Sequence, residues 1–261
     1  MFSVSHPVIG MVHLQPLPGS PRYGGNLRAI HDAALADAQA LREGGVHGLM
    51  LENFGDLPFY PARVPAHVVA YMSAIALEIR RRVDLPLGIN VLRNDGCAAL
   101  AVAHAAGAQF IRVNVLCGAR VTDQGIVQGI AHDLLRDRAA LQATSIRIFA
   151  DVDVKHSAAL APRPLADEVE DTIHRGLADA VIVSGSGTGK STSLEKVKAI
   201  KATAGGKPVY IGSGVTAEAI REYLPFCDGF IVGTSVKRDG NAENAVEVQR
   251  VRELVAKIAS E

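Results

Sequence analysis

The densest group of ionisable side chains after an apolar run lies at residues 151–156, which include Asp151, Asp153 and Lys155. If the preceding strand continues through them, these three side chains share one face, because strand side chains alternate with period two. Charged groups are costly against an apolar helix layer, so we expect this face to point into a polar opening, where Lys155 pairs with one or both carboxylates. Crowded carboxylates and desolvated lysines have shifted pKa values that suit acid–base or Schiff-base chemistry. The sequence therefore predicts three catalytic residues here, and the alternative is an ion-pair network that only fills the interior.

Two glycine-rich turns follow apolar runs near the C-terminal end of the chain, at residues 211–215 and 231–235. Glycines let the backbone approach an anion, and successive amides can converge on phosphate oxygens. A helix N-terminus after each turn would add partial positive charge. The alternative is that the small residues only form tight turns. The predicted phosphate-binding residues are Gly212, Ser213, Gly214, Gly233, Thr234 and Ser235.

Further polar side chains end or follow the other apolar runs. We predict His13 and Glu52 as catalytic residues, with His13 moving a proton. Arg112 lies deep in its run and is expected to pair with Glu52 or Asp151. The predicted substrate-binding residues, which would orient hydroxyl groups or stabilise negative charge, are Asn90, Asn94, Arg112, Asn114, Ser184 and Gly185.

Two other kinds of site have partial support in the sequence. Glu52, Asp151 and Asp153 could form an oxygen-rich Mg²⁺ or Mn²⁺ site, but no local ligand spacing supports it, so we predict no metal and no cofactor. Residues 184–191 end like a P-loop, yet Ser184 stands where a P-loop requires glycine. We interpret them as a flexible loop over the site, with Lys190 adding anion contacts, and keep a nucleotide-hydrolysing enzyme as the alternative.

Eight short apolar runs alternate with eight helical patterns along the chain, which predicts βαβ crossovers and a parallel sheet. The expected strands are 8–14, 48–53, 87–92, 110–116, 147–154, 180–184, 209–212 and 229–233. The expected helices are 27–43, 68–82, 96–106, 131–142, 165–176, 193–204, 217–224 and 241–259. Eight units favour one (β/α)8 TIM barrel of the phosphate-binding type, with residues 1–261 as a single domain, over an open doubly wound sheet.

Longer segments follow four of the expected strands and are expected to be loops on the C-terminal face of the barrel, where such barrels build their sites. They are residues 15–26, 54–67, 117–130 and 155–164.

The composition narrows the function classes. The 261 residues carry 27 basic and 27 acidic side chains, so the net charge of zero gives no reason to expect a nucleic-acid partner. No apolar stretch is long enough to span a membrane, and no secretory signal is recognised, while peripheral membrane association stays open. Three cysteines far apart predict neither disulfides nor a zinc ribbon and favour a cytoplasmic setting. Exposed outer helices favour a homo-oligomer.

Several stretches of the chain resemble the BtpA/SgcQ family, whose relatives include a factor for photosystem I biogenesis in cyanobacteria. The matching stretches are residues 11–19, 51–56, 88–95, 111–115, 150–157 and Ser184-Gly185 with Thr188-Gly189. The resemblance implies a barrel of the ribulose-phosphate-binding kind, and it supplies no reaction.

Together these observations predict an enzyme acting on a small phosphorylated metabolite, either a sugar phosphate or a nucleotide-derived compound. Lyase, isomerase or aldolase chemistry fits best, because no redox-cofactor fingerprint is present. The alternative from a different class is an assembly or stability factor that binds protein or membrane.

Overall fold

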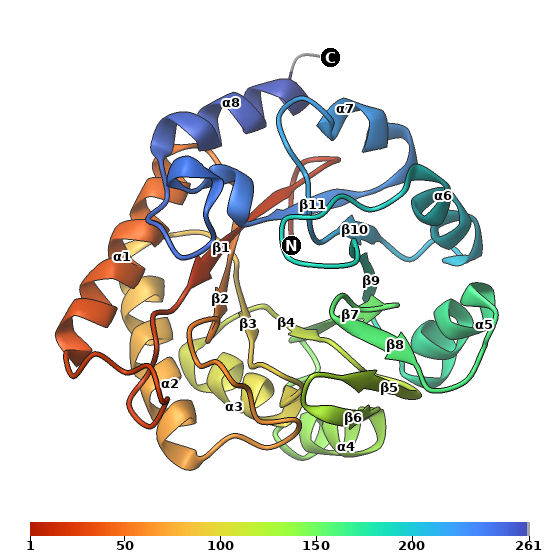
Figure 1. The fold of residues 1–261 in the computed structure, drawn as a ribbon, viewed down its shortest axis with the longest axis horizontal. Coiled ribbons are helices and arrows are strands. Elements are labelled where there is room, and N and C mark those ends of the chain that lie inside the picture. The colour runs from red at the N-terminus through yellow and green to blue at the C-terminus, as the bar shows by residue number, and fades with distance from the viewer. Residues whose placement is uncertain (260–261) are drawn as a thin grey trace.

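Eight parallel strands close into a barrel in the computed structural model, which describes residues 1–259. Figure 1 looks into this barrel, with the helices as an outer ring. Around the barrel the strands are β1 (Val8–His13), β2 (Gly48–Glu52), β3 (Leu87–Asn90), β4 (Phe110–Val113), β7 (Arg147–Val152), β9 (Ala180–Val183), β10 (Val209–Ile211) and β11 (Gly229–Val232), which pairs with β1. The predicted closed (β/α)8 barrel is confirmed, with all eight expected strands present.

The outer helices place apolar stripes against the strands and end at recognisable caps. Asn26 accepts a hydrogen bond from the amide of Ala29 at the start of the first helix, and Asp95 and Ser193 cap two later helices in the same way. The helices are α1 (Leu27–Glu43), α2 (Ala66–Arg82), α3 (Gly96–Ala106), α4 (Ala131–Ala140), α5 (Leu165–Glu170), α6 (Leu194–Thr203), α7 (Ile220–Tyr223) and α8 (Val248–Ala259).

Apolar side chains fill the inside of the barrel below the polar residues at the strand ends. The rings of Phe110 and Phe149 stack with centroids 4.8 Å apart, and Tyr210 packs on Phe149 at 4.9 Å. Gly88 makes room for this cluster, because a Cβ atom there would lie 2.2 Å from the ring of Phe110. The barrel interior is therefore a packed core, and polar chemistry is confined to the carboxyl ends of the strands.

A small antiparallel sheet covers one side of the barrel where two loops were predicted. It consists of β5 (Ala119–Thr122), β6 (Gly125–Gln128) and β8 (Ser157–Ala159), in the order β6-β5-β8. Its strands lie beside α4 and α5 in Figure 1. The prediction of plain loops at 117–130 and 155–164 is therefore wrong, because three- and four-residue strands with exposed side chains leave no apolar alternation to detect.

Two helices near the C-terminal end begin later than predicted. The helix expected at 241–259 begins at Val248, after two 3-10 turns at Thr234–Val236 and Arg238–Gly240. The helix expected at 217–224 is only the four-residue α7. Within residues 1–259, no helix is long and apolar enough to cross a membrane.

Candidate functional site

Two adjoining cavities open at the carboxyl ends of the barrel strands and share Glu52, Arg112, Lys155 and Thr188. One, of about 360 Å³, is bordered by the turns 212–217 and 233–235, and we call it the amide half of the mouth. The other, of about 510 Å³, has walls from the segments after β2 and β3, and we call it the apolar half. The apolar side chains that line it are Phe54, Leu57, Phe59 and Leu92.

The floor between the two halves is a buried ion pair. Arg112 donates two hydrogen bonds of 2.8 Å to Asp151, through Nε and Nη2, and both side chains are almost completely buried. Burial alone would lower the pKa of Arg112, but the charge and hydrogen bonds of Asp151 outweigh it and raise that pKa. Asn114 Nδ2 at 3.0 Å and Ser184 Oγ at 3.1 Å complete the shell of Asp151. The expected pairing of Arg112 is confirmed, and the carboxylate of Asp151 is fully engaged in it.

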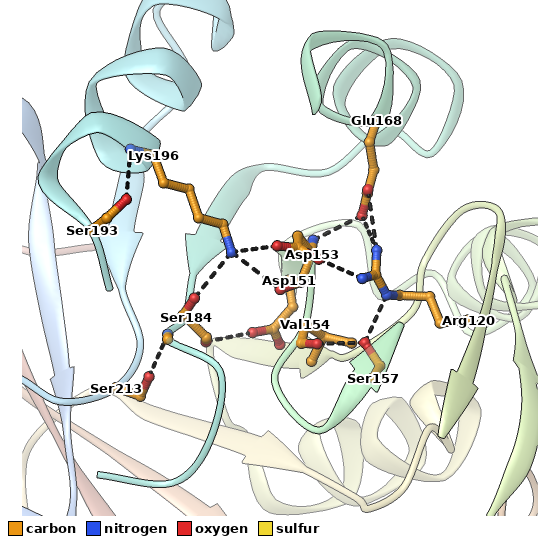
Figure 2. Close-up of polar contacts among 11 residues, drawn as sticks. Arg120, Asp151, Asp153, Val154, Ser157, Glu168, Ser184, Ser193, Lys196 and Ser213 are labelled. Atoms are coloured by element: carbon orange, nitrogen blue, oxygen red, sulfur yellow. Dashed lines mark hydrogen bonds and ion pairs between the residues drawn. The ribbon is translucent and has the colours of Figure 1, made fainter. Parts of the chain in front are cut away.

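Asp153 lies outside the mouth, contrary to the expectation that it shares a face with Asp151. Strand β7 ends at Val152, and Asp153 adopts a positive φ of 50°, so the period-two alternation stops before it. Its carboxylate instead contacts Lys196 Nζ at 2.7 Å and Arg120, as Figure 2 shows. Burial opposes its ionisation, but the hydrogen bonds and charges of Lys196 and Arg120 lower its pKa overall. The predicted placement of Asp153 as a mouth residue is wrong.

The cluster around Asp153 fastens the small sheet to the barrel. Arg120 of β5 also binds Glu168 of α5 at 3.2 Å and donates to Ser157 at 2.7 Å (Figure 2). The backbone amide of Asp153 donates to Glu168 Oε1 at 2.8 Å. These contacts therefore serve the architecture.

Glu52, Asp151 and Asp153 do not converge on a common point, so they do not form the divalent-metal site that the sequence left as an alternative. In the part of the chain that the structure describes, no group of three His, Cys, Asp or Glu residues is arranged to hold a metal ion.

Lys155 stands at the junction of the two halves and lines both cavities. Within residues 1–259 its Nζ makes no ion pair or hydrogen bond, so the expected contact with the carboxylates of Asp151 and Asp153 is wrong. Burial lowers its pKa and the charge of Arg112 lowers it further, while Glu52 and Asp151 oppose these effects in part. The position and the lowered pKa are those of a lysine that can act as a base or as an amine nucleophile.

His13 and Glu52 face each other beside Lys155. The Nδ1 of His13 lies 3.1 Å from the carbonyl oxygen of Ala242, which can only accept, so Nδ1 carries the ring proton. Burial lowers the pKa of His13 to about 4, so the ring is neutral at pH 7 and Nε2 is an unprotonated acceptor 3.8 Å from Glu52 Oε1. Asn90 fixes the other carboxylate oxygen of Glu52 through a hydrogen bond of 2.5 Å.

Backbone amides of the turns after β10 and β11 border the amide half. Within residues 1–259 several amides bordering this cavity have no hydrogen-bond partner, among them those of Gly214, Val215, Gly233, Thr234 and Ser235. Their donors are available to an anion in the cavity. The expected full helices behind the two turns are absent, because α7 begins only at Ile220 and a 3-10 turn follows β11.

The loop 185–191 borders the amide half and holds its turns in place. Gly214 has a φ of +68°, and a Cβ there would lie 2.3 Å from the backbone of Lys190. The Ser213 hydroxyl accepts from the amide of Gly185 at 2.8 Å and donates to the Lys190 carbonyl, so it is engaged in the loop. Thr188 and Gly189 of this loop line the mouth, whereas Lys190 does not.

The amides of that loop argue against the P-loop alternative. Gly185 donates to Ser213, Thr188 to His156 Nε2 and Lys190 to the Gly187 carbonyl. A P-loop presents such amides to phosphates, whereas here the protein itself uses them.

Four of the predicted substrate-binding residues lie behind the cavities and line neither of them. Asn90 orients Glu52, and Ser184 orients Asp151. Asn94 binds the backbone of Val115 and Gln128, and Gly185 binds Ser213. Of that set, Arg112 and Asn114 line the mouth.

The sequence reasoning missed the side chains that form the apolar half. Phe54, Leu57 and Phe59 come from one loop and Arg93 from another. Phe54 and Arg93 lie within the stretches 51–56 and 88–95 of the family resemblance, but that resemblance assigns them no role. Their convergence depends on the path of the two loops, which local sequence patterns do not specify.

Comparison with known proteins connects this fold to one family. The family model for the BtpA family matches residues 4–260. An uncharacterized protein of Thermococcus kodakarensis is 49% identical, the match covering 95% of this chain and 94% of the relative. The photosystem I biogenesis protein BtpA of Synechocystis is 46% identical, covering 99% of this chain and 90% of the relative.

Solved structures share the barrel at low sequence identity. Phosphoribosyl anthranilate isomerase from Thermus thermophilus superposes with a TM-score of 0.58 at 14% identity, covering 97% of this chain and 98% of the other. The native KDPGal structure superposes with a TM-score of 0.59 at 16% identity, covering 99% and 97%. These likenesses show the fold.

Proposed function

The chain belongs to the BtpA family, and we propose from the geometry of its barrel mouth that it is an enzyme acting on a small phosphorylated metabolite. The phosphate group is bound in the amide half, and the reacting carbon atoms lie beside Lys155, Glu52 and His13. The structural neighbours include barrels named for phosphorylated compounds, which is consistent with this class of ligand.

The observation that carries the proposal is the set of unpaired backbone amides around one cavity, which includes those of Gly214, Val215 and Gly233 to Ser235. Buried or half-buried backbone donors are normally paired, and an oxyanion is the ligand that satisfies several converging N–H groups at once. The turns after strands seven and eight of a (β/α)8 barrel are also the recurrent phosphate site of this fold.

The proposed catalysis rests on three side chains that meet at the junction of the two halves, Lys155, His13 and Glu52. Burial lowers the pKa of Lys155, and its Nζ has no ion-pair partner within residues 1–259, so the amine is free to meet a substrate. Neutral His13 offers Nε2 as a proton acceptor, and Glu52 is held by Asn90 within 3.8 Å of it. Proton removal beside a carbonyl, or attack of the lysine on that carbonyl, fits lyase, isomerase or aldolase chemistry.

Ser235 provides a matched pair of variants to test phosphate binding. Ser235→Asp places a negative charge among the unpaired amides, whereas Ser235→Asn is nearly isosteric with the aspartate and neutral. We expect the dissociation constant for inorganic phosphate to rise at least about tenfold in the aspartate variant relative to the asparagine variant, a difference of ~1.4 kcal/mol. Equal phosphate affinity in the two variants would contradict the site.

Reductive trapping tests the role of Lys155. We expect borohydride with a panel of phosphorylated aldehydes and ketones to add covalent mass at Lys155 in the unchanged chain and none in Lys155→Met. Phosphate affinity should be the same in both proteins. Turnover of a phosphorylated compound by Lys155→Met at the full rate would exclude both the base and the nucleophile role.

A second candidate function comes from the 46% identical relative of Synechocystis, which is named as a photosystem I biogenesis protein. If this chain acts as an assembly factor, the mouth residues are dispensable and an exposed surface carries the activity. Expression of Lys155→Met and Ser235→Asp in a strain lacking that relative separates the two functions. Rescue of photosystem I by both variants would favour the assembly role.

A further inference from the structure

The apolar half of the mouth contains a buried cation that forms no ion pair with any residue that the structure describes. Arg93 is 4% exposed and lines this cavity together with Phe54, Leu57 and Phe59. Its Nη2 donates to the backbone carbonyl of Lys155 at 2.6 Å, but within residues 1–259 its side chain forms no ion pair. Its Nε is buried without any hydrogen-bond partner, and Nη1 makes no hydrogen bond to the described residues.

The surroundings of Arg93 do not favour a free cation. Burial lowers its pKa, and the nearby charge of Arg112 lowers it further, while the charges of Asp151, Asp123 and Glu52 oppose this from beyond contact distance. Asp151 is already engaged by Arg112, and Asp123 is exposed at the rim on the turn between β5 and β6. A buried guanidinium without a counter-charge is costly to folding, which points to an anionic ligand that compensates for it when bound.

Asn114 adds a second unsatisfied group in the same cavity. Its Nδ2 must face Asp151, because the ionised carboxylate paired with Arg112 can only accept hydrogen bonds. That orientation leaves Oδ1 buried without a partner, in a side chain that is 2% exposed and lines the apolar half. The cavity therefore presents the buried guanidinium of Arg93 and an unpaired acceptor on Asn114 beside apolar walls, and Lys155, Glu52 and Asp123 line it as well.

We propose that the apolar half binds a carboxylate of the substrate through Arg93, carried on an apolar or aromatic group that donates an N–H or O–H hydrogen bond to Asn114. This inference rests on the proposed function and narrows its substrate class to metabolites with a phosphate at one end and a carboxylate at the other. The planar fork of one guanidinium matches a carboxylate. His156 also lines this half, but its Nε2 is occupied by the amide of Thr188.

Lys155 lies between the two anion sites, since it lines both halves. A substrate held at both ends would therefore place its central atoms beside Lys155, Glu52 and His13. Fixing both ends of a substrate also fixes which atom meets the base.

The test compares benzoate with benzamide, two probes of nearly equal shape and different charge, in the presence of saturating inorganic phosphate. We expect benzoate to bind the unchanged chain with a dissociation constant at least tenfold lower than that of benzamide. Equal binding of the two probes would show an apolar pocket without an anion site and would overturn the inference. Phenyl phosphate binding tighter than benzoate at the same site would equally overturn the carboxylate assignment.

Variants locate the probe and separate this inference from the proposed function. Arg93→Met should abolish the preference for benzoate while leaving the affinity for inorganic phosphate unchanged, and its melting temperature should not fall, because a buried unpaired charge has been removed. Ser235→Asp should weaken inorganic phosphate and leave benzoate unchanged. Retained benzoate preference in Arg93→Met refutes the carboxylate site, whereas phosphate that binds Ser235→Asp and Ser235→Asn equally refutes the proposed function.

Discussion

In one half of the barrel mouth a ligand meets mainly backbone groups, and in the other half it meets side chains. The amide half presents backbone donors from the turns after β10 and β11, held in shape by glycines and by the loop 185–191. The apolar half presents side chains from the loops after β2 and β3, with Arg93 and Asn114 as its unsatisfied polar groups. A backbone site recognises an oxyanion whatever carries it, whereas a side-chain site selects shape and charge. We infer that the first half anchors the substrate and the second half sets its identity.

The largest expected effect comes from the floor that both halves share. Asp151→Asn removes the anion that neutralises Arg112 and leaves a buried guanidinium unpaired. We expect a loss of about 3–5 kcal/mol in the free energy of unfolding, measured by urea denaturation.

Asp153→Asn is the matched control, because it removes a carboxylate two residues further along the chain. That side chain is 43% exposed and lines neither cavity, so we expect a loss below about 1 kcal/mol and unchanged phosphate affinity. Similar losses of unfolding free energy in the two variants would show that the Arg112–Asp151 pair stabilises the fold no more than the contacts of Asp153 do.

His13, in the amide half, gives the next largest effect through pH. Burial lowers its pKa from 6.5 to about 4, so between these pH values the imidazole binds a proton in the unfolded chain and stays neutral in the folded chain. This contribution to stability is present above pH 6.5 and is lost as the pH falls towards 4, by up to about 3 kcal/mol. We expect His13→Phe to flatten the pH dependence of unfolding in that window. An NMR titration showing a pKa of 6.5 for His13 would refute the buried neutral ring.

The smallest effect tests whether the two halves are coupled. Phe54 belongs to the apolar half, yet its ring stacks on His13 with centroids 4.3 Å apart. Phe54→Leu should lose about 0.5–1.5 kcal/mol of stability and raise the pKa of His13 towards 6.5, because the ring gains contact with water. A His13 pKa that stays at about 4 would mean that the halves are independent at this contact.

The sequence predicted the barrel because each strand is a short apolar run and the runs recur with helices between them. It also predicted the turns at Gly212–Gly214 and Gly233–Ser235, since glycine position reports backbone geometry directly. The sequence prediction failed at Asp153, because strand β7 ends at Val152 and Asp153 itself has a positive φ. It also missed Arg93 and Phe54, because their positions follow from the course of loops that carry no periodic pattern.

A crystal structure of the chain grown with inorganic phosphate tests the central claim most directly. We predict tetrahedral density in the amide half, within hydrogen-bond distance of the amides of Gly214, Val215, Gly233, Thr234 and Ser235. Phosphate bound elsewhere in the mouth, with those amides still unpaired, would contradict the account.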